Sequence, residues 1–383
     1  MHLGKRVPSI ALLALAVVAP AAASSSATAA SRVVGHVYVN DNTAGTNTVG
    51  AFDRHADGTL TPAAGSPFSA GGAGTGAGIG SQGSLQTAGH GRFLLAADAG
   101  SDQISVLRIR ANGTLATVAG SPVSSGGKEP VSIAVHNHLV YVANAGTGGS
   151  NYTGFRLTGS GRLHALAGST VALPDGAQPG DVLFNSTGTN LVGTRVGTSQ
   201  IDSFRVGAGG LLTAAAGSPF TAQGPGPFGS EFRPTNPRQL FVSNAHGGTN
   251  AGTVSAFRDA ADGTLTSIGA SPFADLQTAP CWVEISHNGR YLFTVNTAVP
   301  SISRYRIAAS GRLHLLGTSA FNLPGGLGPV DARLAPDGRT LWVVDAGVAK
   351  VSGFRVRGGN LTELHSSPTS LPTGATPFGI VVN

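Results

Sequence analysis

The chain has 383 residues, of which only 11% are charged, and its formal net charge is +6. The basic residues are scattered singly and are not clustered with aromatic side chains, which argues against a nucleic-acid-binding protein. Glycine is abundant, with 57 residues, and this abundance is typical of short strands joined by tight turns.

Residues 1–30 are predicted to be a secretory signal peptide. Lys5 and Arg6 precede an apolar run from Ile10 to Val18, and small residues with Ala-x-Ala sites follow. That run is too short to span a membrane, and no later segment is long and apolar enough. We therefore expect a secreted protein, extracellular or periplasmic, without a membrane span; a retained N-terminal anchor is the alternative. Loss of Lys5 and Arg6 lowers the net charge to +4.

A turn followed by leucine recurs through the mature chain. The spacing between successive copies is 48–55 residues, which is the range expected of propeller blades. The seven leucines are Leu60, Leu115, Leu163, Leu212, Leu265, Leu313 and Leu361.

Each repeat contains four strand-sized segments. In the unit that starts at Pro329 these are PVDARLA, TLWVV, KVSGFRV and NLTELHS, with an Asp337-Gly338 hairpin turn between the first two. The third segment alternates apolar and polar residues, the period of a strand with two different faces. The first segments of the six complete units start at Gln82, Pro130, Pro179, Pro227, Pro280 and Pro329.

The two ends of the chain supply complementary parts of one repeat. HVYV, VGAFDR and TLTPAAG near the N-terminus have no first strand before them, and TPFGIVV at the C-terminus is a first strand with nothing after it. Pairing the ends would close the ring and leave no open sheet edge. The predicted fold is therefore all-β, one seven-bladed β-propeller domain over residues 31–383, with four-stranded antiparallel blades and the C-terminal strand paired with the N-terminal strands.

The repeated elements P-x-x-[IV]-x-x-x-x-[DN]-G-R-x-L-[FWY]-V-x-[DN] and V-S-x-F-R…G-x-L-T resemble the bacterial lactonase family of seven-bladed propellers. That family includes 6-phosphogluconolactonase and the fungal carboxymuconate cyclase. The resemblance implies a small lactone, or the corresponding acid, as the substrate.

The first strand of each blade is innermost, so alternate residues should face the central channel. The second residue after each strand-initial position is Ser84, Ser132, Asp181, Gly229, Trp282, Asp331 or Gly379. The fourth is Gln86, Ala134, Leu183, Glu231, Glu284, Arg333 or Val381.

Charged residues in these two rings are the candidate site. Neighbouring carboxylates such as Glu231 and Glu284 shift each other's pKa, which suits general acid and base catalysis, and Arg333 could hold a substrate carboxylate or an oxyanion. We predict these three as catalytic residues, with Asp181 and Asp331 binding substrate. An ion network that merely fills the channel is the alternative.

The second strands end in a short polar residue, with one departure. These residues are Asp41, Asp98, Asn144, Arg195, Asn244, Asn296 and Asp345. The six short side chains should hold the following turn, whereas Arg195 breaks the pattern. We predict that Arg195 and Trp282 bind substrate at the face formed by these turns and by the loops that lead into each first strand. A solvated arginine in a diverged repeat is the alternative.

Three other sequence features give weaker indications of function. Cys281 is the only cysteine, so no internal disulfide is expected, and its place on an inter-blade face predicts a buried thiol. His136 and His138 form an HxH without a visible third ligand, so no metal is predicted. The Gly-rich sequence GIGSQG over Gly78–Gly83 has no helix after it, which argues against a dinucleotide cofactor, and no cofactor of any kind is expected.

Two functions follow from these observations. The first is a secreted lactonase-like enzyme that hydrolyses or forms a small lactone at the mouth of the channel. The second is a non-catalytic extracellular propeller that binds a glycan, a peptide or a surface polymer. The low charge, the long loop from Ser69 to Gly83 and the lack of histidine beside the strand-initial prolines favour the second. The oligomeric state is left open.

Overall fold

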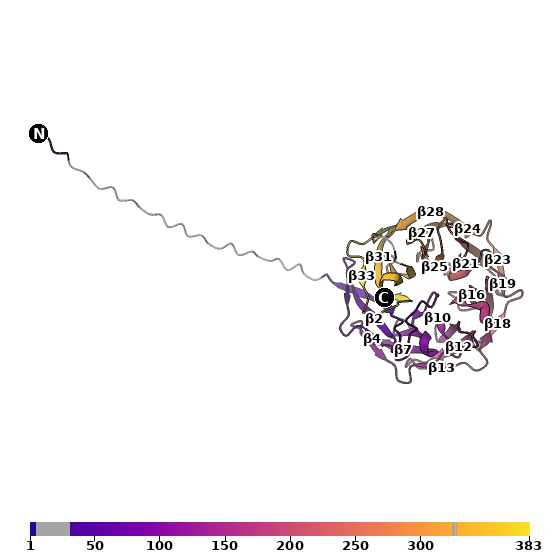
Figure 1. Cartoon of the computed structure of the whole chain (residues 1–383). Coiled ribbons are helices and arrows are strands. Elements are labelled where there is room, and N and C mark those ends of the chain that lie inside the picture. The colour runs from indigo at the N-terminus through magenta and orange to yellow at the C-terminus, as the bar shows by residue number, and fades with distance from the viewer. Residues whose placement is uncertain (5–30, 324–325, 327) are drawn as a thin grey trace. The chain divides into compact units, whose positions relative to one another are not determined.

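Seven antiparallel sheets succeed one another around a ring within Arg32–Asn383 (Figure 1). The computed structural model describes residues 1–4, 31–323, 326 and 328–383. The signal-peptide prediction covers residues 1–30, and positions 5–30 lie outside the described residues. It therefore stays a prediction.

In six blades the strands follow chain order from the channel outward, and in the closing blade the last strand of the chain is the innermost. The innermost strands are β34 (Ile380–Val382), β5 (Leu85–Ala88), β10 (Pro130–His136), β15 (Pro179–Phe184), β20 (Pro227–Arg233), β25 (Pro280–Ile285) and β29 (Pro329–Leu334). The second strands are β1 (Val33–Asn40), β6 (Phe93–Asp98), β11 (Leu139–Asn144), β16 (Asn190–Arg195), β21 (Asn236–Asn244), β26 (Tyr291–Asn296) and β30 (Thr340–Asp345). The third strands are β2 (Thr48–His55), β7 (Gln103–Ile109), β12 (Asn151–Leu157), β17 (Gln200–Val206), β22 (Thr253–Asp259), β27 (Ser301–Ile307) and β31 (Lys350–Arg357).

The outermost strand is divided in six blades and continuous in one. The first pieces are β3 (Leu60–Pro62), β8 (Leu115–Thr117), β13 (Leu163–Ala165), β18 (Leu212–Ala214), β23 (Leu265–Ser267) and β32 (Asn360–Glu363). The second pieces are β4 (Phe68–Ser69), β9 (Val123–Ser124), β14 (Val171–Ala172), β19 (Phe220–Thr221), β24 (Phe273–Ala274) and β33 (Thr369–Ser370). In the remaining blade, β28 (Leu313–Ala320) pairs along the whole of β27. Three short 3-10 helices complete the described elements: η1 (Ala99–Ser101), η2 (Asp175–Ala177) and η3 (Ala346–Val348).

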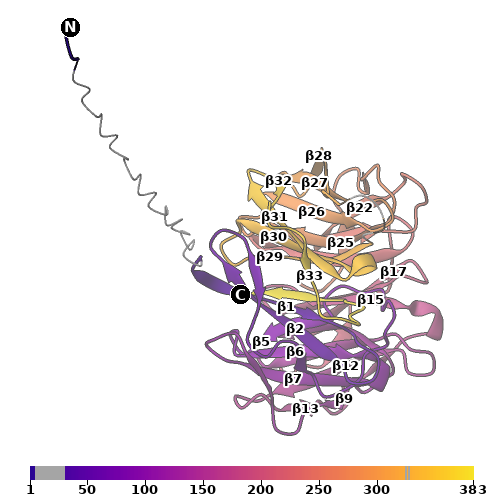
Figure 2. The same ribbon diagram turned by 60° about the vertical axis from the view of Figure 1, so that its left-hand side comes forward.

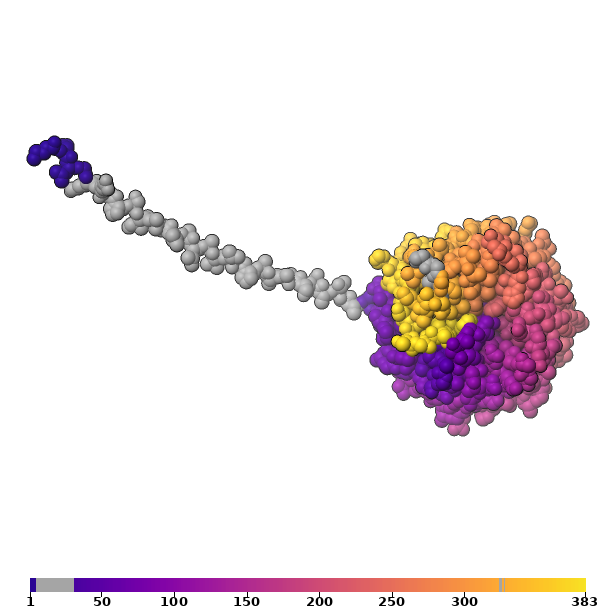
Figure 3. Space-filling view, viewed as in Figure 1, coloured from indigo at the N-terminus to yellow at the C-terminus, as the bar shows by residue number. Residues whose placement is uncertain are grey.

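The ring closes as the sequence predicts. β34 pairs antiparallel with β1, with Tyr38 opposite Val381 and Val39 opposite Ile380. Successive inner strands contact one another around the ring, and β34 contacts both β29 and β5. Figures 2 and 3 show the yellow C-terminal segment beside the indigo N-terminal blade. The seven-bladed propeller and its mode of closure are thus confirmed.

Apolar side chains fill the space between neighbouring blades. Every residue of β6 and β11 is buried, because both faces of each second strand are covered by the adjacent blades. Among the largest fully buried side chains are Tyr141 and Trp342, both on second strands. Burial of such surface contributes roughly 25 cal/mol per Å². A single cysteine and no disulfide are therefore compatible with a stable fold.

Candidate active site

Five of the predicted site residues come together in the central channel. Arg333 Nη1 lies 3.3 Å from Glu284 Oε2, and this ion pair joins the inner strands of two adjacent blades. The charge of Arg333 also acts on Glu231 and Asp331. Asp181 lies close enough to Asp331 to feel its negative charge. The structure thus brings these residues near one another, and their catalytic and binding roles stay predictions.

The channel carboxylates have a structural task that the sequence did not reveal. An innermost strand has one edge without a partner strand, so its backbone N–H groups need other acceptors. The N–H of Ile285 donates to Glu231 Oε2 at 2.7 Å, and the N–H of Leu334 donates to Glu284 Oε1 at 2.9 Å. Each glutamate thus satisfies the strand edge of the next blade.

Asp181 lies one ring nearer the beginning of the inner strands and repeats this arrangement. The backbone N–H of Ser230 donates to Asp181 Oδ2 at 2.9 Å, and the Ser230 hydroxyl donates to the same oxygen at 2.6 Å. Ser132 Oγ donates to Asp181 Oδ1 at 3.1 Å and accepts the N–H of Val182 at 3.1 Å. Side chains of one blade therefore tie it to the next around much of the channel.

Burial and mutual repulsion alter the protonation of these carboxyl groups. Burial, reinforced by the charge of Glu284, raises the pKa of Glu231 well above its usual range, and Arg333 opposes the shift. Burial also raises the pKa of Glu284, with Arg333 and the N–H of Leu334 opposing. Burial raises the pKa of Asp181 to about 7. Because four carboxyl groups share one guanidinium, they do not all ionise near neutral pH.

Solvent reaches this cluster through Arg333 and Glu231. The side chain of Arg333 is 27% exposed and that of Glu284 is 5% exposed, while Glu231 is half-buried. A partly exposed carboxyl group beside a buried carboxylate and a guanidinium can donate or accept a proton at neutral pH. The cluster thus has the groups needed for acid–base chemistry on a ligand in the channel.

A short segment, Ser81–Gly83, occupies the channel on the side where the inner strands begin. We call it the channel plug. It comes from the loop between β4 and β5 and hydrogen-bonds to the inner strands of five blades, through Val131 O, Ile133 N, Gly180 O, Ser230 O, Val283 N, the indole of Trp282 and the carboxylate of Asp331. The plug therefore fills the channel at the level of the first to third residues after each strand-initial position.

Gln82 is the centre of the plug. Its backbone N–H donates to Gly180 O at 2.9 Å, and its side-chain amide donates to Ser230 O and accepts from the N–H of Val283, both at 2.9 Å. A Cβ on Gly229 would lie 2.2 Å from Gln82 Oε1, so glycine at this position makes room for the glutamine. Gln82 is only 5% exposed.

Trp282 lies beneath the plug. Its indole N–H donates to Ser81 O at 2.8 Å, and its ring packs edge-on against Phe228 with centroids 5.1 Å apart. The ring of Phe378 lies at 6.5 Å. Because Trp282 is 3% exposed and its only polar donor is engaged, the contact with substrate predicted for it requires the plug to move.

The plug and the charged cluster lie at different levels of the channel. The plug contacts the first to third residues after the strand-initial positions, whereas Glu231, Glu284 and Arg333 are the fourth residues after them. The plug therefore lies toward the loop face, where we expected the ligand to enter. A sequence signal for this existed, because Gln82 replaces the proline that starts the other inner strands.

Arg195 forms an ion pair within its own blade, a contact that we did not predict. Its Nε and Nη2 atoms donate to the two oxygens of Asp202, both at 2.6 Å, and Tyr152 donates to Asp202 Oδ2 at 3.0 Å. Arg195 and Asp202 are seven residues apart in the sequence. The same separation joins Asp98 to Ser105 and Asp345 to Ser352, which are hydrogen-bonded in other blades. Arg195 therefore replaces the usual Asx–Ser contact with an ion pair. A local structural reason accounts for its departure from the repeat.

The remaining sequence motifs lie outside the channel chemistry. Cys281 is buried, as predicted, and burial raises the pKa of its thiol to about 11. Within residues 31–323, 326 and 328–383, no group of three or more His, Cys, Asp or Glu side chains is arranged to hold a metal ion. No helix in the described part of the chain has the length and apolarity required to cross a bilayer.

Comparisons with known proteins agree with this architecture. The family model described as "Lactonase, 7-bladed beta-propeller" matches residues 230–378, which confirms the resemblance to that family. No curated protein matches the sequence.

Solved structures with the same fold cover nearly the whole propeller. A candidate 6-phosphogluconolactonase from Bacteroides uniformis is 19% identical, with a TM-score of 0.72 over 92% of this chain and 100% of that one. The periplasmic gluconolactonase PpgL of Pseudomonas aeruginosa is 16% identical, with a TM-score of 0.71 over 91% of this chain and 98% of its own. At these identities the likeness establishes the fold alone.

Proposed function

We propose that the protein is a secreted lactonase that hydrolyses a small lactone in the channel, at the end opposite the plug. The observation that carries the proposal is the meeting of Glu231, Glu284 and Arg333 at one level of the channel, where the side chain of Arg333 is 27% exposed. Family resemblance and the gluconolactonase neighbour support the substrate class.

In the proposed reaction the two glutamates have different protonation states. Glu284, paired with Arg333, is the ionised member and removes a proton from water as the water attacks the lactone carbonyl carbon. Arg333 stabilises the negative charge that develops on the carbonyl oxygen. Glu231 is the protonated member and gives its proton to the ring oxygen as the C–O bond breaks. The product is the open hydroxy acid, and proton exchange with solvent restores both glutamates.

Turnover of a lactone panel by the purified mature protein tests this proposal. Glu284→Gln and Glu231→Gln should each lower kcat by about 10²–10⁴, the usual contribution of a general acid or base. Glu363→Gln, which changes a carboxylate near the outer edge of a blade, is the matched control and should retain full activity. Full activity of both channel variants, with their fold verified by circular dichroism, would eliminate the mechanism.

A non-catalytic binding propeller is the second candidate, and two observations favour it. The channel carboxylates accept backbone N–H groups of adjacent strands, and the plug closes the channel at the loop face. In that case no lactone in the panel is hydrolysed, and glycans or peptides bind to the wild type and to the glutamine variants equally.

Export remains part of the proposal and has its own test. Expression of the full chain with its natural N-terminus should yield a mature protein outside the cytoplasm that starts near residue 31. N-terminal sequencing of the product checks this. An intact N-terminus in the cytoplasmic fraction contradicts it.

A further inference from the structure

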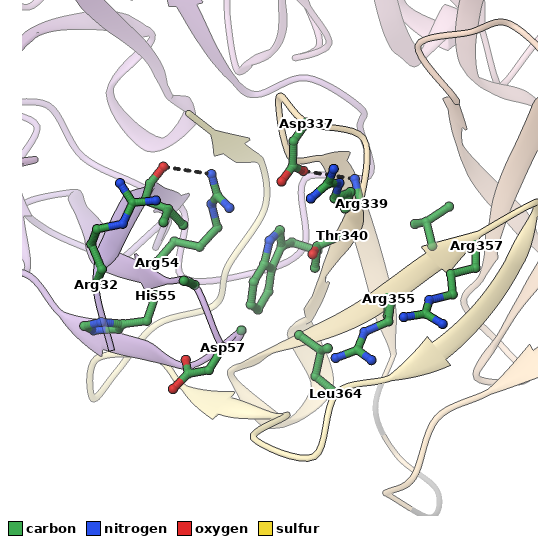
Figure 4. Close-up of a pocket in the computed structure, with 15 residues that line it drawn as sticks. Arg32, Arg54, His55, Asp57, Asp337, Arg339, Thr340, Arg355, Arg357 and Leu364 are labelled. Atoms are coloured by element: carbon green, nitrogen blue, oxygen red, sulfur yellow. Dashed lines mark hydrogen bonds between the residues drawn. The ribbon is translucent and has the colours of Figure 1, made fainter. Parts of the chain in front are cut away.

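A cavity lies where the first and last blades meet, and the plug residues Ser81–Gly83 do not line it. The cavity has a volume of about 610 Å³ and lies between β1–β2 and β30–β31 (Figure 4). Five arginines and two aspartates line it, together with Trp342: Arg32, Arg54, Arg339, Arg355, Arg357, Asp57 and Asp337. We call it the seam pocket. Its volume is in the range of small-molecule sites.

Arg54 departs from the repeat at this seam. Arg54 lies opposite Leu60 of the neighbouring outer strand. In two other blades the equivalent residues are Val356, opposite Leu361, and Ile109, opposite Leu115. The other blades have Leu157, Val206, Asp259 and Ile307 at this position. A guanidinium thus replaces an aliphatic side chain in five of the six comparisons.

The buried guanidinium of Arg54 has incomplete partners. Arg54 is 8% exposed, and its Nη2 donates to the carbonyl oxygens of Val34 and Asn383, both at 3.2 Å. Its Nε has no hydrogen-bond partner among the described residues. Burial lowers the pKa of Arg54, with the charge of Asp337 opposing. A buried cation that bonds mainly to carbonyl oxygens is costly unless an anion joins it.

Trp342 supplies a second buried donor without a partner. It is 2% exposed, and its Nε1 has no acceptor among the described residues. Tyr38 and Tyr141 hold the equivalent position in two other blades, where their hydroxyls donate to Gly113 O and Gly210 O in the next blade. At the seam the equivalent turn glycine is Gly58, which lines the pocket, and the donor is left free.

The exposed arginines complete the positive lining. Figure 4 shows Arg355 and Arg357 on β31 at one side of the pocket and Arg54 on β2 at the other side. Planar guanidinium groups bind carboxylate and phosphate oxygens in pairs. Because cations approach from two sides, the pocket suits a ligand with more than one anionic group.

We propose that the seam pocket binds a small organic anion that carries two or more carboxylate or phosphate groups. Arg54 and the Trp342 indole N–H contact its inner end, and Arg355 and Arg357 contact its outer end. This site is independent of the channel and of the lactonase proposal, so the two succeed or fail separately.

Titration of the whole mature protein with citrate and with inorganic phosphate tests the site, with heat and tryptophan emission as the readouts. Glucose is the neutral control, and sodium chloride at matched ionic strength is the control for general screening. We expect saturable binding of citrate, weaker binding of phosphate, and a change in Trp342 emission. The relative strengths distinguish a tricarboxylate from a single phosphate as the better occupant.

Two variants locate the binding. The double variant Arg355→Gln with Arg357→Gln should weaken citrate binding by at least about tenfold, because each substitution removes a charge-assisted hydrogen bond to the anion. Trp342→Phe should remove the emission change; Phe241 and Phe293 hold the equivalent position in other blades, so the variant should fold. The matched control is Arg205→Gln with Arg258→Gln, which removes the same charge at the position of Arg355 in two other blades.

The outcome is decisive in either direction. Tight binding lost only in the seam variants supports the site. No saturable binding of either anion, or equal weakening in the Arg205/Arg258 control, overturns it.

Discussion

Arg333 and Glu284 form an ion pair between two adjacent blades, with Nη1 3.3 Å from Oε2, and the N–H of Leu334 donates to the other oxygen of the same carboxylate. The arginine therefore holds in place a carboxylate that also closes the free edge of the next strand. A residue that we propose for catalysis is at the same time part of the framework of the channel.

Arg333→Leu should destabilise the protein mainly at neutral and alkaline pH. Leu183 holds the equivalent position in another blade, so the side chain fits the repeat. Loss of the cation raises the pKa of Glu284 further, so the stability lost to ionising Glu284 increases as pH rises. We expect a loss of about 2 kcal/mol at pH 8 and little at pH 4, the partial exposure of Arg333 reducing the usual cost of a broken buried pair.

Urea unfolding at the two pH values measures this difference. Adding Glu284→Gln to Arg333→Leu should recover part of the loss, because no buried charge then remains unpaired. Equal destabilisation at pH 4 and pH 8 would contradict the electrostatic explanation.

Arg195→Ala should destabilise the blade formed by β15–β18 by about 3 kcal/mol, since it leaves the buried carboxylate of Asp202 without its cation. Arg195→Asn with Asp202→Ser reproduces the contact type of the other blades and should recover most of this loss. Thermal unfolding checks both variants. If Arg195 instead binds substrate, the stable double variant will show a raised KM, a result that a purely structural role does not predict.

Gln82→Ala should destabilise the protein by about 2 kcal/mol, because Ser230 O and the N–H of Val283 lose their partner in a buried place. It should also expose Trp282, whose ring lies under the plug. Acrylamide quenching in a Trp342→Phe background reports on Trp282 alone. Gln277→Ala, which removes an amide at the surface, is the control, and unchanged quenching in Gln82→Ala would contradict the proposed cover.

Asp345→Asn should stabilise the protein at pH 8 but not at pH 4. Burial raises the pKa of Asp345 to about 7, so the folded state keeps its proton at a pH where the unfolded chain has lost it. The contribution of Asp345 to the free energy of unfolding is therefore fully present below about pH 4 and is lost as the pH rises toward 7. Asn144, Asn244 and Asn296 hold the equivalent position, so the amide should fit. We expect a gain of about 1–3 kcal/mol.

Urea unfolding from pH 4 to pH 8 measures the effect. Asp175→Asn, which changes an exposed carboxylate, is the control and should leave the slope with pH unaltered. A gain in Asp345→Asn that does not depend on pH would point to packing and not to ionisation.

The fold was predictable because its signals are local and repeated. Turn residues at intervals of about fifty, a strand-initial proline and the split repeat at the two ends all depend on sequence neighbours or on a simple count. The same alternation predicted Glu231, Glu284 and Arg333 in one ring of the channel, and in the structure these three side chains lie near one another.

The candidate site was only partly predictable, because its details depend on residues from distant parts of the chain. Ser81 and Trp282 are separated by 201 residues, and their hydrogen bond exists only when the ring is closed. Arg195 departs from the repeat in the sequence, and the structure shows that it pairs with Asp202 of the next strand in the same blade.

The sequence alone determined the number of blades, the order of their strands and the identity of the inward-facing charges, since these follow from periodicity. Tertiary structure decided which charges are paired, which level of the channel the plug fills, and where the closing seam leaves donors of Arg54 and Trp342 without a partner in the described part of the chain. The physical reason is that hydrogen-bond satisfaction and burial are properties of atoms brought together across blades, and no interval along the chain specifies them.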